Sequence, residues 1–241
     1  MIYFSYPKSY FPHKAIEIKS KVDTIFQNDI SKLEQPEKDY SRVTEKAELE
    51  EQKISPEEFK LLYPYVNNLT EDTKQKVNSA ISDTEVNLFK NNVLITSPID
   101  FKTIISGYSV PLNQKGLLSV LFELYYYTGG AHGNTVYDSL SIDLNSGEIY
   151  KLNDLFNPKL NYIPQLNEIS IRKAKEGGVP LLTEYKGLTE DQKFYLTPTF
   201  LVLYYQLYEY TPYAYGRFEV KIPYTEIQSL IYPLSPIQKL L

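Results

Sequence analysis

The chain of 241 residues has no cysteine, no tryptophan, one methionine and two histidines. Without cysteine it can form no disulfide, no thiolate nucleophile and no Cys-ligated zinc site. A metal site built on both histidines would need His13 and His132, which show no recognisable ligand spacing. We therefore expect no metal and no cofactor.

Clustered basic residues are missing as well. The formal net charge is −5, whereas binding to nucleic acid calls for a basic face. The phosphate-binding patterns GxxxxGK[ST] and GxGxxG do not occur either. We therefore expect no nucleic-acid partner.

Long hydrophobic runs are absent. The longest, within residues 117–127, is interrupted by Ser119 and Glu123, and it falls short of the ~18 apolar residues of a membrane span. Residues 1–11 lack the basic start, apolar middle and small-residue cleavage site of a signal peptide. We expect no membrane span, and the sequence leaves open whether a leader was removed.

Tyrosine, in contrast, is abundant, with 23 residues. Its flat ring supplies contact area at low entropic cost, either within a core or on a binding surface. The apolar run that ends in three tyrosines, 117–127, leads directly into the glycine-rich segment 128–133. Apolar residues occupy both faces of this run, which predicts a central strand covered on two sides. Residues 107–112 have strand composition, so the two segments predict a hairpin joined through 113–116.

Before the hairpin, apolar spacing predicts a helix over 15–33, followed by an exposed helix or excursion over 34–53 that is rich in both charges. A Ser-Pro-Glu-Glu sequence at 55–58 predicts the start of a short helix that ends before Pro64. Another segment can begin at 70–72, and 86–95 has strand character.

After the hairpin, alternating apolar residues predict further hairpins, with one helix between them and one at the end. The predicted elements are a hairpin over 135–144 and 148–152, a helix from Pro164 to 177, a hairpin over 194–197 and 200–207, an aromatic loop over 208–216, a strand over 218–222 and a helix over 224–231. Early helices followed by successive hairpins indicate an α+β protein.

Several motifs in this order resemble one family of extracytoplasmic regions, that of RsiV-type anti-sigma factors and PdaC-type polysaccharide deacetylases. The motifs are Tyr127–Asn134 (YTGGAHGN), Asp143–Gly147, Leu152–Phe156, Phe194–Thr197, Tyr208–Gly216 and Ile222–Ile227.

The resemblance implies two intertwined α+β modules, a PdaC-like module over 1–144 and an RsiV-like module over 145–241. The second would resemble a subdomain of the Hsp70 ATPase. An envelope-associated or secreted setting and a binding role are also implied, since RsiV-type proteins sense lysozyme with this region. The sequence shows neither a transmembrane helix nor an appended deacetylase module, so we do not expect lysozyme recognition to carry over by default.

The glycine-rich segment has two interpretations. Backbone amides around Gly129, Gly130, His132 and Gly133 could cradle an anion. A strand, rather than a helix, is expected directly after it, which favours a structural loop that turns a sharp corner with positive φ angles.

A catalytic role is the alternative for two polar residues. His132 could act as a general base with Asp138, Asp143 or Glu123 as its orienting acid, and Glu123 could be one carboxylate of a polysaccharide-acting hydrolase. The plainer interpretation makes His132 a hydrogen-bonded structural group and Glu123 an edge-facing or paired acid.

The aromatic loop offers four candidate binding residues, Tyr208, Tyr210, Tyr213 and Tyr215. Their rings could stack on sugars or dock a protein partner, or they could fold back as a satellite core. Together with the resemblance, the loop favours a non-enzymatic recognition domain that binds a protein or a cell-wall glycan. The hydrolase remains the alternative, and a purely structural module is a third possibility.

Overall fold

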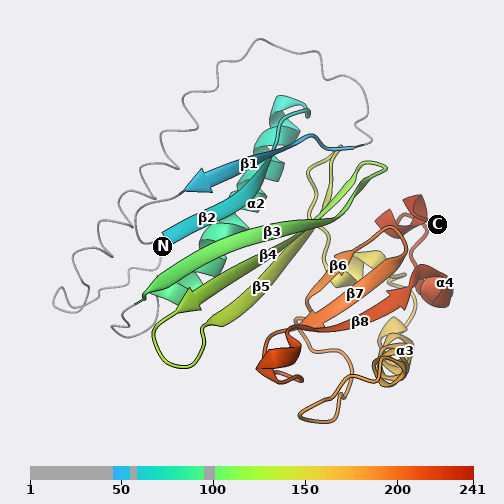
Figure 1. Cartoon of the computed structure of the whole chain (residues 1–241). Helices are drawn as coiled ribbons and strands as arrows, with labels where there is room; N and C mark the ends of the chain where they lie inside the picture. Colours follow the sequence, from blue (N-terminus) through green and yellow to red (C-terminus); the bar gives the residue numbers. More distant parts are fainter. Residues whose placement is uncertain (1–45, 55–58, 95–100) are drawn as a thin grey trace, which may run out of the picture.

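The computed structural model describes residues 46–54, 59–94 and 101–241. Two β-sheets and several helices occur in this part of the chain, which confirms the predicted α+β class (Figure 1). The predicted helix over 15–33 and the predicted helix start at 55–58 lie outside the described residues. Within those residues, no helix has both the length and the apolar character needed to cross a bilayer.

The first sheet has five strands in sequence order: β1 (Leu49–Ile54), β2 (Phe59–Val66), β3 (Thr103–Gln114), β4 (Leu117–Tyr127) and β5 (Asn134–Asp143). Neighbouring strands are antiparallel except β2 and β3, which run parallel. The strand predicted to be central, β4, lies between β3 and β5, so its backbone groups are paired along both edges.

The β3–β4 hairpin confirms the sequence prediction but turns more tightly. Lys115 and Gly116 form a two-residue connection with φ of 54° and 73°, in place of the four residues expected. Two successive positive φ angles match the right-handed twist of the flanking strands, and glycine adopts one of them without strain. The tight turn fixes which residues of β4 face which side.

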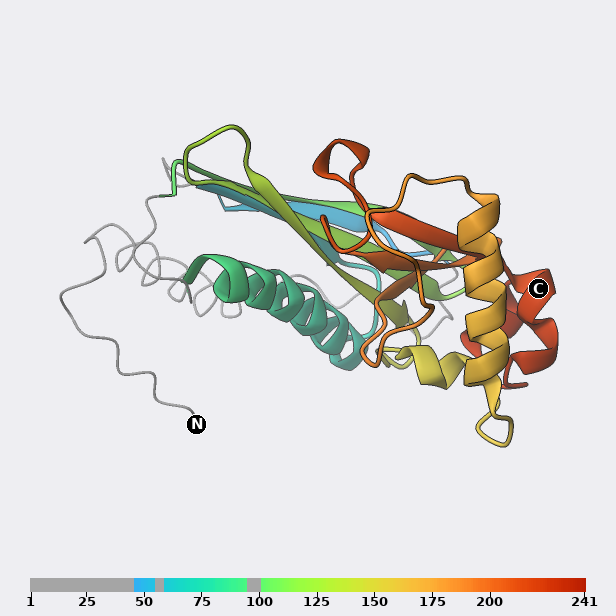
Figure 2. The ribbon, with the colours of Figure 1, turned by 90° about the horizontal axis from the view of Figure 1, so that it is seen from below.

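One face of the first sheet is covered by α2 (Glu71–Phe89), whose buried residues include Val77, Ile81 and Leu88. These pack with Val120 and Phe122 of β4 in the first hydrophobic core. Figures 1 and 2 show α2 running along this face of the strands. Burying one helical stripe against the sheet supplies most of the driving force for both elements.

Three predictions in this module were wrong. Residues 49–53 belong to β1 rather than to an exposed helix or excursion, and 59–66 form β2 rather than a helix that ends before Pro64. Pairing between the two strands satisfies their backbone groups, a long-range effect that local composition does not report. Residues 86–94, the described part of the predicted strand 86–95, are helical, because α2 runs to Phe89 and continues as a π-helical turn, η1 (Lys90–Leu94). The polar Glu85, buried on the inner face of α2, had obscured the helical spacing.

The second sheet has three antiparallel strands: β6 (Phe194–Leu196), β7 (Phe200–Tyr205) and β8 (Phe218–Pro223). The helices α3 (Tyr162–Glu176) and α4 (Tyr224–Ile227) accompany it, with short 3-10 helices η2 (Leu152–Leu155), η3 (Tyr213–Tyr215), η4 (Gln228–Leu230) and η5 (Pro236–Lys239). The structure confirms several predictions in this part of the chain. They are the third hairpin (β6 and β7), the helix that begins near 162 (α3), the strand β8 and the helix α4.

The predicted second hairpin is wrong in its second arm. The single bridge Ile142–Ile149 joins the end of β5 to the following segment, with the Tyr150 N–H donating to the Ser141 carbonyl at 2.8 Å, and η2 begins at Leu152. Two residues of the first hairpin, Leu112 and Leu117, lie in the core of the second module. The two modules therefore share apolar side chains. The module boundary at 144/145 and the likeness to an Hsp70 ATPase subdomain stay predictions.

Where the sheets meet, the second sheet covers only part of the first. Leu121 packs with Tyr195, Val202 and Tyr204, and the Leu196 N–H donates to the Ser119 hydroxyl at 3.2 Å. Further along the same face of β4 the side chains become exposed. The predicted two-sided coverage therefore holds up to Phe122 and ends at Glu123, leaving an open sheet face.

Candidate functional site

The glycine-rich segment forms the loop between β4 and β5. Gly129 and Gly130 both have φ of 102°, in the region expected for a sharp corner. The Tyr127 hydroxyl closes the loop by donating to the Gly130 carbonyl at 2.7 Å. Gly133 lies against Tyr125, and a Cβ there would meet the tyrosine ring at 2.5 Å. The loop's structural role stays a prediction, which these contacts support.

His132 is exposed at the tip of this loop, and both of its ring nitrogens have partners. Nδ1 lies 2.7 Å from the Gly133 carbonyl oxygen, and Nε2 lies 3.1 Å from the Tyr208 hydroxyl. A carbonyl can only accept, so we assign the proton to Nδ1, and the Tyr208 hydroxyl then donates to Nε2. In this arrangement the basic lone pair of the imidazole is already engaged.

None of the predicted orienting acids bonds to His132. Asp138 pairs with Lys193 at 2.6 Å, and Asp143 pairs with Lys239 at 2.8 Å. Glu123 lies on the open face of the sheet, across the strand pair from Tyr137. The described residues therefore contain no His–carboxylate pair at this loop, and they contain no group of three or more His, Cys, Asp or Glu that could hold a metal.

The aromatic loop after β7 meets the glycine-rich loop. The Tyr213 ring stacks on His132 with 4.0 Å between centroids and 19° between planes, and Tyr208 stacks beside it at 6.0 Å from Tyr213. Figure 2 shows both loops rising on the side away from α2. We call His132, Tyr208 and Tyr213 the aromatic cluster.

The four predicted tyrosines thus divide into different environments. Tyr208 and Tyr215 are 51% and 47% exposed, and Tyr208 has a positive φ of 64°, which is uncommon for a residue with a side chain. Tyr210 instead packs edge-on against Tyr185 and Tyr205 in the second core. The aromatic loop therefore combines the two predicted roles, because one of its rings packs into the core and three stay near the surface.

A second group, which the sequence analysis missed, lies next to the aromatic cluster. The Arg217 guanidinium lies 4.4 Å from the centroid of the Tyr137 ring, and it donates to Glu219 Oε1 from Nε at 3.0 Å and from Nη2 at 2.6 Å. The Tyr195 hydroxyl donates to the same oxygen at 2.9 Å. The sequence carried a sign of this group, because Arg217, just before β8, and Glu219 and Lys221 within it alternate with apolar residues.

The charges of this group have definite physical causes. Burial opposes the charge on Arg217, but the hydrogen bonds and charge of Glu219 outweigh it and raise the pKa of the guanidinium above its usual value. Burial also raises the pKa of Tyr137, against the opposing effect of Arg217. The tyrosine therefore stays a neutral hydroxyl beside a permanently charged guanidinium.

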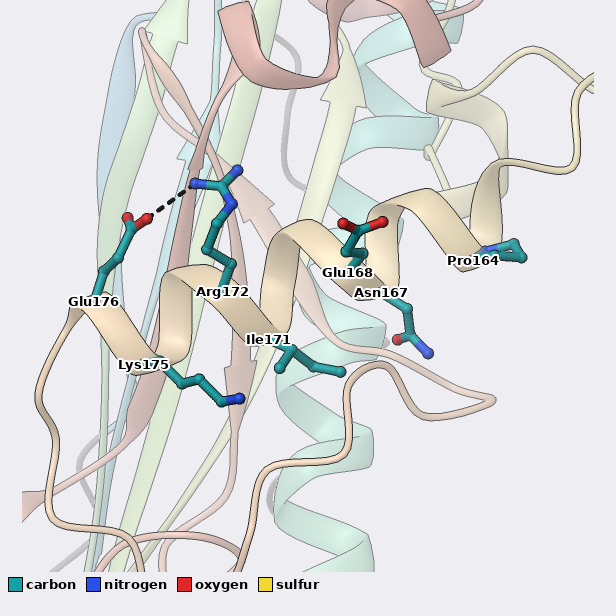
Figure 3. Close-up of a pocket in the computed structure, with 7 residues that line it drawn as sticks. All are labelled: Pro164, Asn167, Glu168, Ile171, Arg172, Lys175 and Glu176. Atoms are coloured by element: carbon teal, nitrogen blue, oxygen red, sulfur yellow. Dashed lines mark hydrogen bonds and ion pairs between the residues drawn. The ribbon is translucent and has the colours of Figure 1, made fainter.

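A shallow hollow also runs along the outer flank of α3 (Figure 3). Its lining comes from one helix only and includes Ile171 beside the ion pair of Arg172 and Glu176, whose atoms are 2.9 Å apart. Neither the aromatic cluster nor the Arg217 group contributes to this lining. The predicted site residues and the hollow are therefore separate features.

The fold and these contacts define the class: an α+β protein with two sheet modules, whose loops meet in an exposed aromatic cluster. The chain belongs to the family described as "Deacetylase PdaC", whose model matches residues 2–135. The model of a second family, "Protein of unknown function (DUF3298)", matches residues 153–225. The word deacetylase belongs to the family's description, and no activity of this chain follows from it.

Two solved structures of the DUF3298 family share the fold. The one from Bacteroides fragilis has a TM-score of 0.58 and 21% identity, covering 82% of this chain and 99% of its own. The one from Pseudomonas aeruginosa has a TM-score of 0.53 and 16% identity, covering 83% and 97%. None of the curated proteins compared with the chain matches it.

Proposed function

We propose that this protein is a non-enzymatic recognition module that binds a protein or a glycan of the cell envelope through its aromatic cluster. The observation that carries the proposal is the stack of His132 and Tyr213, which comes from two modules and stays accessible at their junction. Exposed aromatic rings held in place by neighbours are typical anchors of binding surfaces, because little entropy is lost when they are covered.

The cluster is held in place before any ligand arrives. Tyr208 bonds to His132 at 3.1 Å, and the Thr211 hydroxyl donates to the Gly216 carbonyl at 2.8 Å, which closes the aromatic loop on itself. The Gln206 side chain bonds both backbone groups of Tyr137 at 2.9 Å and so ties the base of this loop to β5. These bonds support a surface shaped in advance for its ligand.

The setting we propose is extracytoplasmic or secreted. Its support is the match of the chain to the PdaC family together with the motifs shared with RsiV-type regions. Within this proposal the chain resembles the sensing part of such proteins, while lysozyme remains one partner to be tested rather than the default.

A polysaccharide-acting hydrolase is the second candidate, favoured by the family's description as a deacetylase. His132 and Glu123 would be its reactive groups. The geometry argues against this candidate, because the His132 lone pair accepts from Tyr208 and none of the carboxylates in the described part of the chain orients the ring. If the purified chain turned over a glycan and His132→Gln abolished this activity, the hydrolase would replace the recognition module as the better proposal.

The test is a binding measurement on the Tyr213→Ala, Tyr215→Ala double variant. The probes are purified peptidoglycan in a cosedimentation assay, a glycan array, and lysozyme as the protein ligand. Tyr232→Ala is the matched control, since it removes a partly exposed tyrosine that lies after α4. We expect the double variant to lose most of the binding and the control to keep it. Unchanged binding by a folded double variant would rule this surface out.

A further inference from the structure

Tyr137 stands at the centre of the surface beside the aromatic cluster. Glu123 is its register partner on β4, and the Arg217 guanidinium lies 4.4 Å from the centroid of its ring, so one tyrosine adjoins an acid and a guanidinium. Within the described residues this hydroxyl has no hydrogen bond of its own. A polar group with unused bonding capacity in a fixed position is what a polar ligand needs.

Glu123 supplies an acceptor on the same side of the sheet. It is exposed, and no hydrogen bond or ion pair joins it to another described residue. Its neighbour on β3 is Gly107, where an added Cβ would lie 3.4 Å from the Glu123 carboxylate. The missing side chain at Gly107 leaves the carboxylate open on that flank.

Arg217 supplies donors in a fixed orientation. Glu219 Oε1 accepts from Nε at 3.0 Å and from Nη2 at 2.6 Å. Two rings restrain the plane of the guanidinium. Its carbon lies 4.4 Å from the centroid of the Tyr137 ring and 5.8 Å from that of the Tyr204 ring. The guanidinium is therefore oriented before a ligand arrives, so a contact with a ligand hydroxyl costs little side-chain freedom.

We propose that the ligand is an uncharged oligosaccharide chain, an inference that rests on the proposed binding function. The chain lies across Tyr213 and Tyr137, and its hydroxyls form hydrogen bonds with Glu123 and Arg217. A sugar ring offers an apolar face that stacks on aromatic rings, and hydroxyls that both donate and accept. The surface matches both features. Acids and bases alternate over it, with Lys221 3.7 Å from Glu219, so their charges largely cancel and favour neither an anionic nor a cationic chain.

The test titrates the full chain with four tetrasaccharides by calorimetry and NMR. Cellotetraose and N-acetylchitotetraose are neutral, chitosan tetraose is cationic and tetragalacturonate is anionic. We expect at least one neutral probe to bind, and the charged probes to bind more weakly. Glu123→Gln, Tyr137→Phe and Arg217→Lys should each weaken the neutral probe by about tenfold, the effect of losing one good hydrogen bond. Glu168→Gln, an exposed acid on α3, is the control and should bind as the parent does.

The outcomes separate this inference from the proposed function. If the Tyr213→Ala, Tyr215→Ala variant loses a ligand that Glu123→Gln, Tyr137→Phe and Arg217→Lys all retain, the oligosaccharide site is wrong and the aromatic surface stands. Tighter binding of a charged tetrasaccharide, or no binding of any neutral one, overturns the inference as well. If none of these variants changes binding of any probe, both proposals fail. Thermal melting of each variant shows that a loss of binding is not a loss of fold.

Discussion

The imidazole of His132 and the ring of Tyr213 stack at 4.0 Å, although they belong to different modules. Tyr208, 76 positions from His132 in the chain, completes the contact with a hydrogen bond. These two contacts tie the loop between β4 and β5 to the loop after β7.

The His132–Tyr213 contact should be measurable as a coupling energy. In a double-mutant cycle of His132→Ala and Tyr213→Ala, we expect a coupling of about 1 kcal/mol in the free energy of unfolding, as for other stacked aromatic pairs. Urea unfolding of the four proteins measures it. The same cycle with Tyr215→Ala in place of Tyr213→Ala is the control, and there the two effects should simply add. Additivity in both cycles would mean that the stack contributes nothing.

Glu85 should make the protein less stable as the pH rises. Its side chain is completely buried, with the Ser106 hydroxyl as a weak polar neighbour and no hydrogen bond of good geometry to either carboxylate oxygen within the described residues. Burial raises the pKa of Glu85 from 4.5 to about 7, with Ser106 offsetting part of the effect. The unfolded chain therefore loses this proton first, so stability is full below pH 4.5 and is lost progressively up to about pH 7. The free energy of unfolding lost over this pH range is roughly 3 kcal/mol.

Glu85→Gln tests this dependence because it removes the titration while keeping the size of the side chain. We expect the unfolding free energy of this variant to be flatter between pH 4.5 and 7, and higher than that of the parent at pH 8. Asp83→Asn, on the exposed side of the same helix, should follow the parent curve. Parallel curves for Glu85→Gln and the parent would show that Glu85 is not buried as an isolated acid.

The ion pair of Lys239 and Asp143 should anchor the end of the chain to the first sheet. The Asp143 carboxylate is nearly buried, and it accepts from the Asn145 and Ser146 amides at 2.8 and 3.0 Å. Burial by itself would raise the pKa of Asp143, but Lys239 and the two amides lower it overall. This stabilisation is present above the unfolded pKa of 3.8 and disappears as the pH falls below it.

Lys239→Met removes one partner and leaves the acid nearly buried. We expect a loss of about 2 kcal/mol in urea unfolding at pH 7 and a smaller loss at pH 3. Lys159→Met, which changes an exposed lysine outside the ion pairs of the described residues, should be neutral. Equal effects of the two substitutions at pH 7 would show that the anchor does not stabilise the fold.

Gly187 should tolerate a side chain less well than Gly178, although both have positive φ angles of 101° and 61°. A Cβ at Gly187 would overlap the Asn167 amide, which accepts from the Leu188 N–H at 2.7 Å. Nothing lies within 4 Å of a Cβ at Gly178. We expect Gly178→Ala to cost about 1 kcal/mol and Gly187→Ala roughly 2 kcal/mol more, measured by thermal or urea unfolding. Equal costs would contradict the role of Asn167.

Several elements could be read directly from residue patterns. The β3–β4 hairpin, α3, the β6–β7 hairpin and β8 all follow from short-range periodicity and turn residues. The failures share one cause. β1 and β2 have compositions that resemble loop or helix locally, and their pairing with each other and with β3 makes them strands. In α2, the buried acid Glu85 interrupted the apolar pattern that would have revealed a long helix.

The candidate site shows the same division. The sequence determined the α+β class and the supply of tyrosines, because these depend on composition and on side-chain spacing within one element. Only the tertiary structure decided that Tyr210 packs inward, that His132 bonds to Tyr208 and no acid, and that Arg217 stacks on Tyr137. These contacts join residues from different strands and loops, and the packing of the two sheets against each other brings them together.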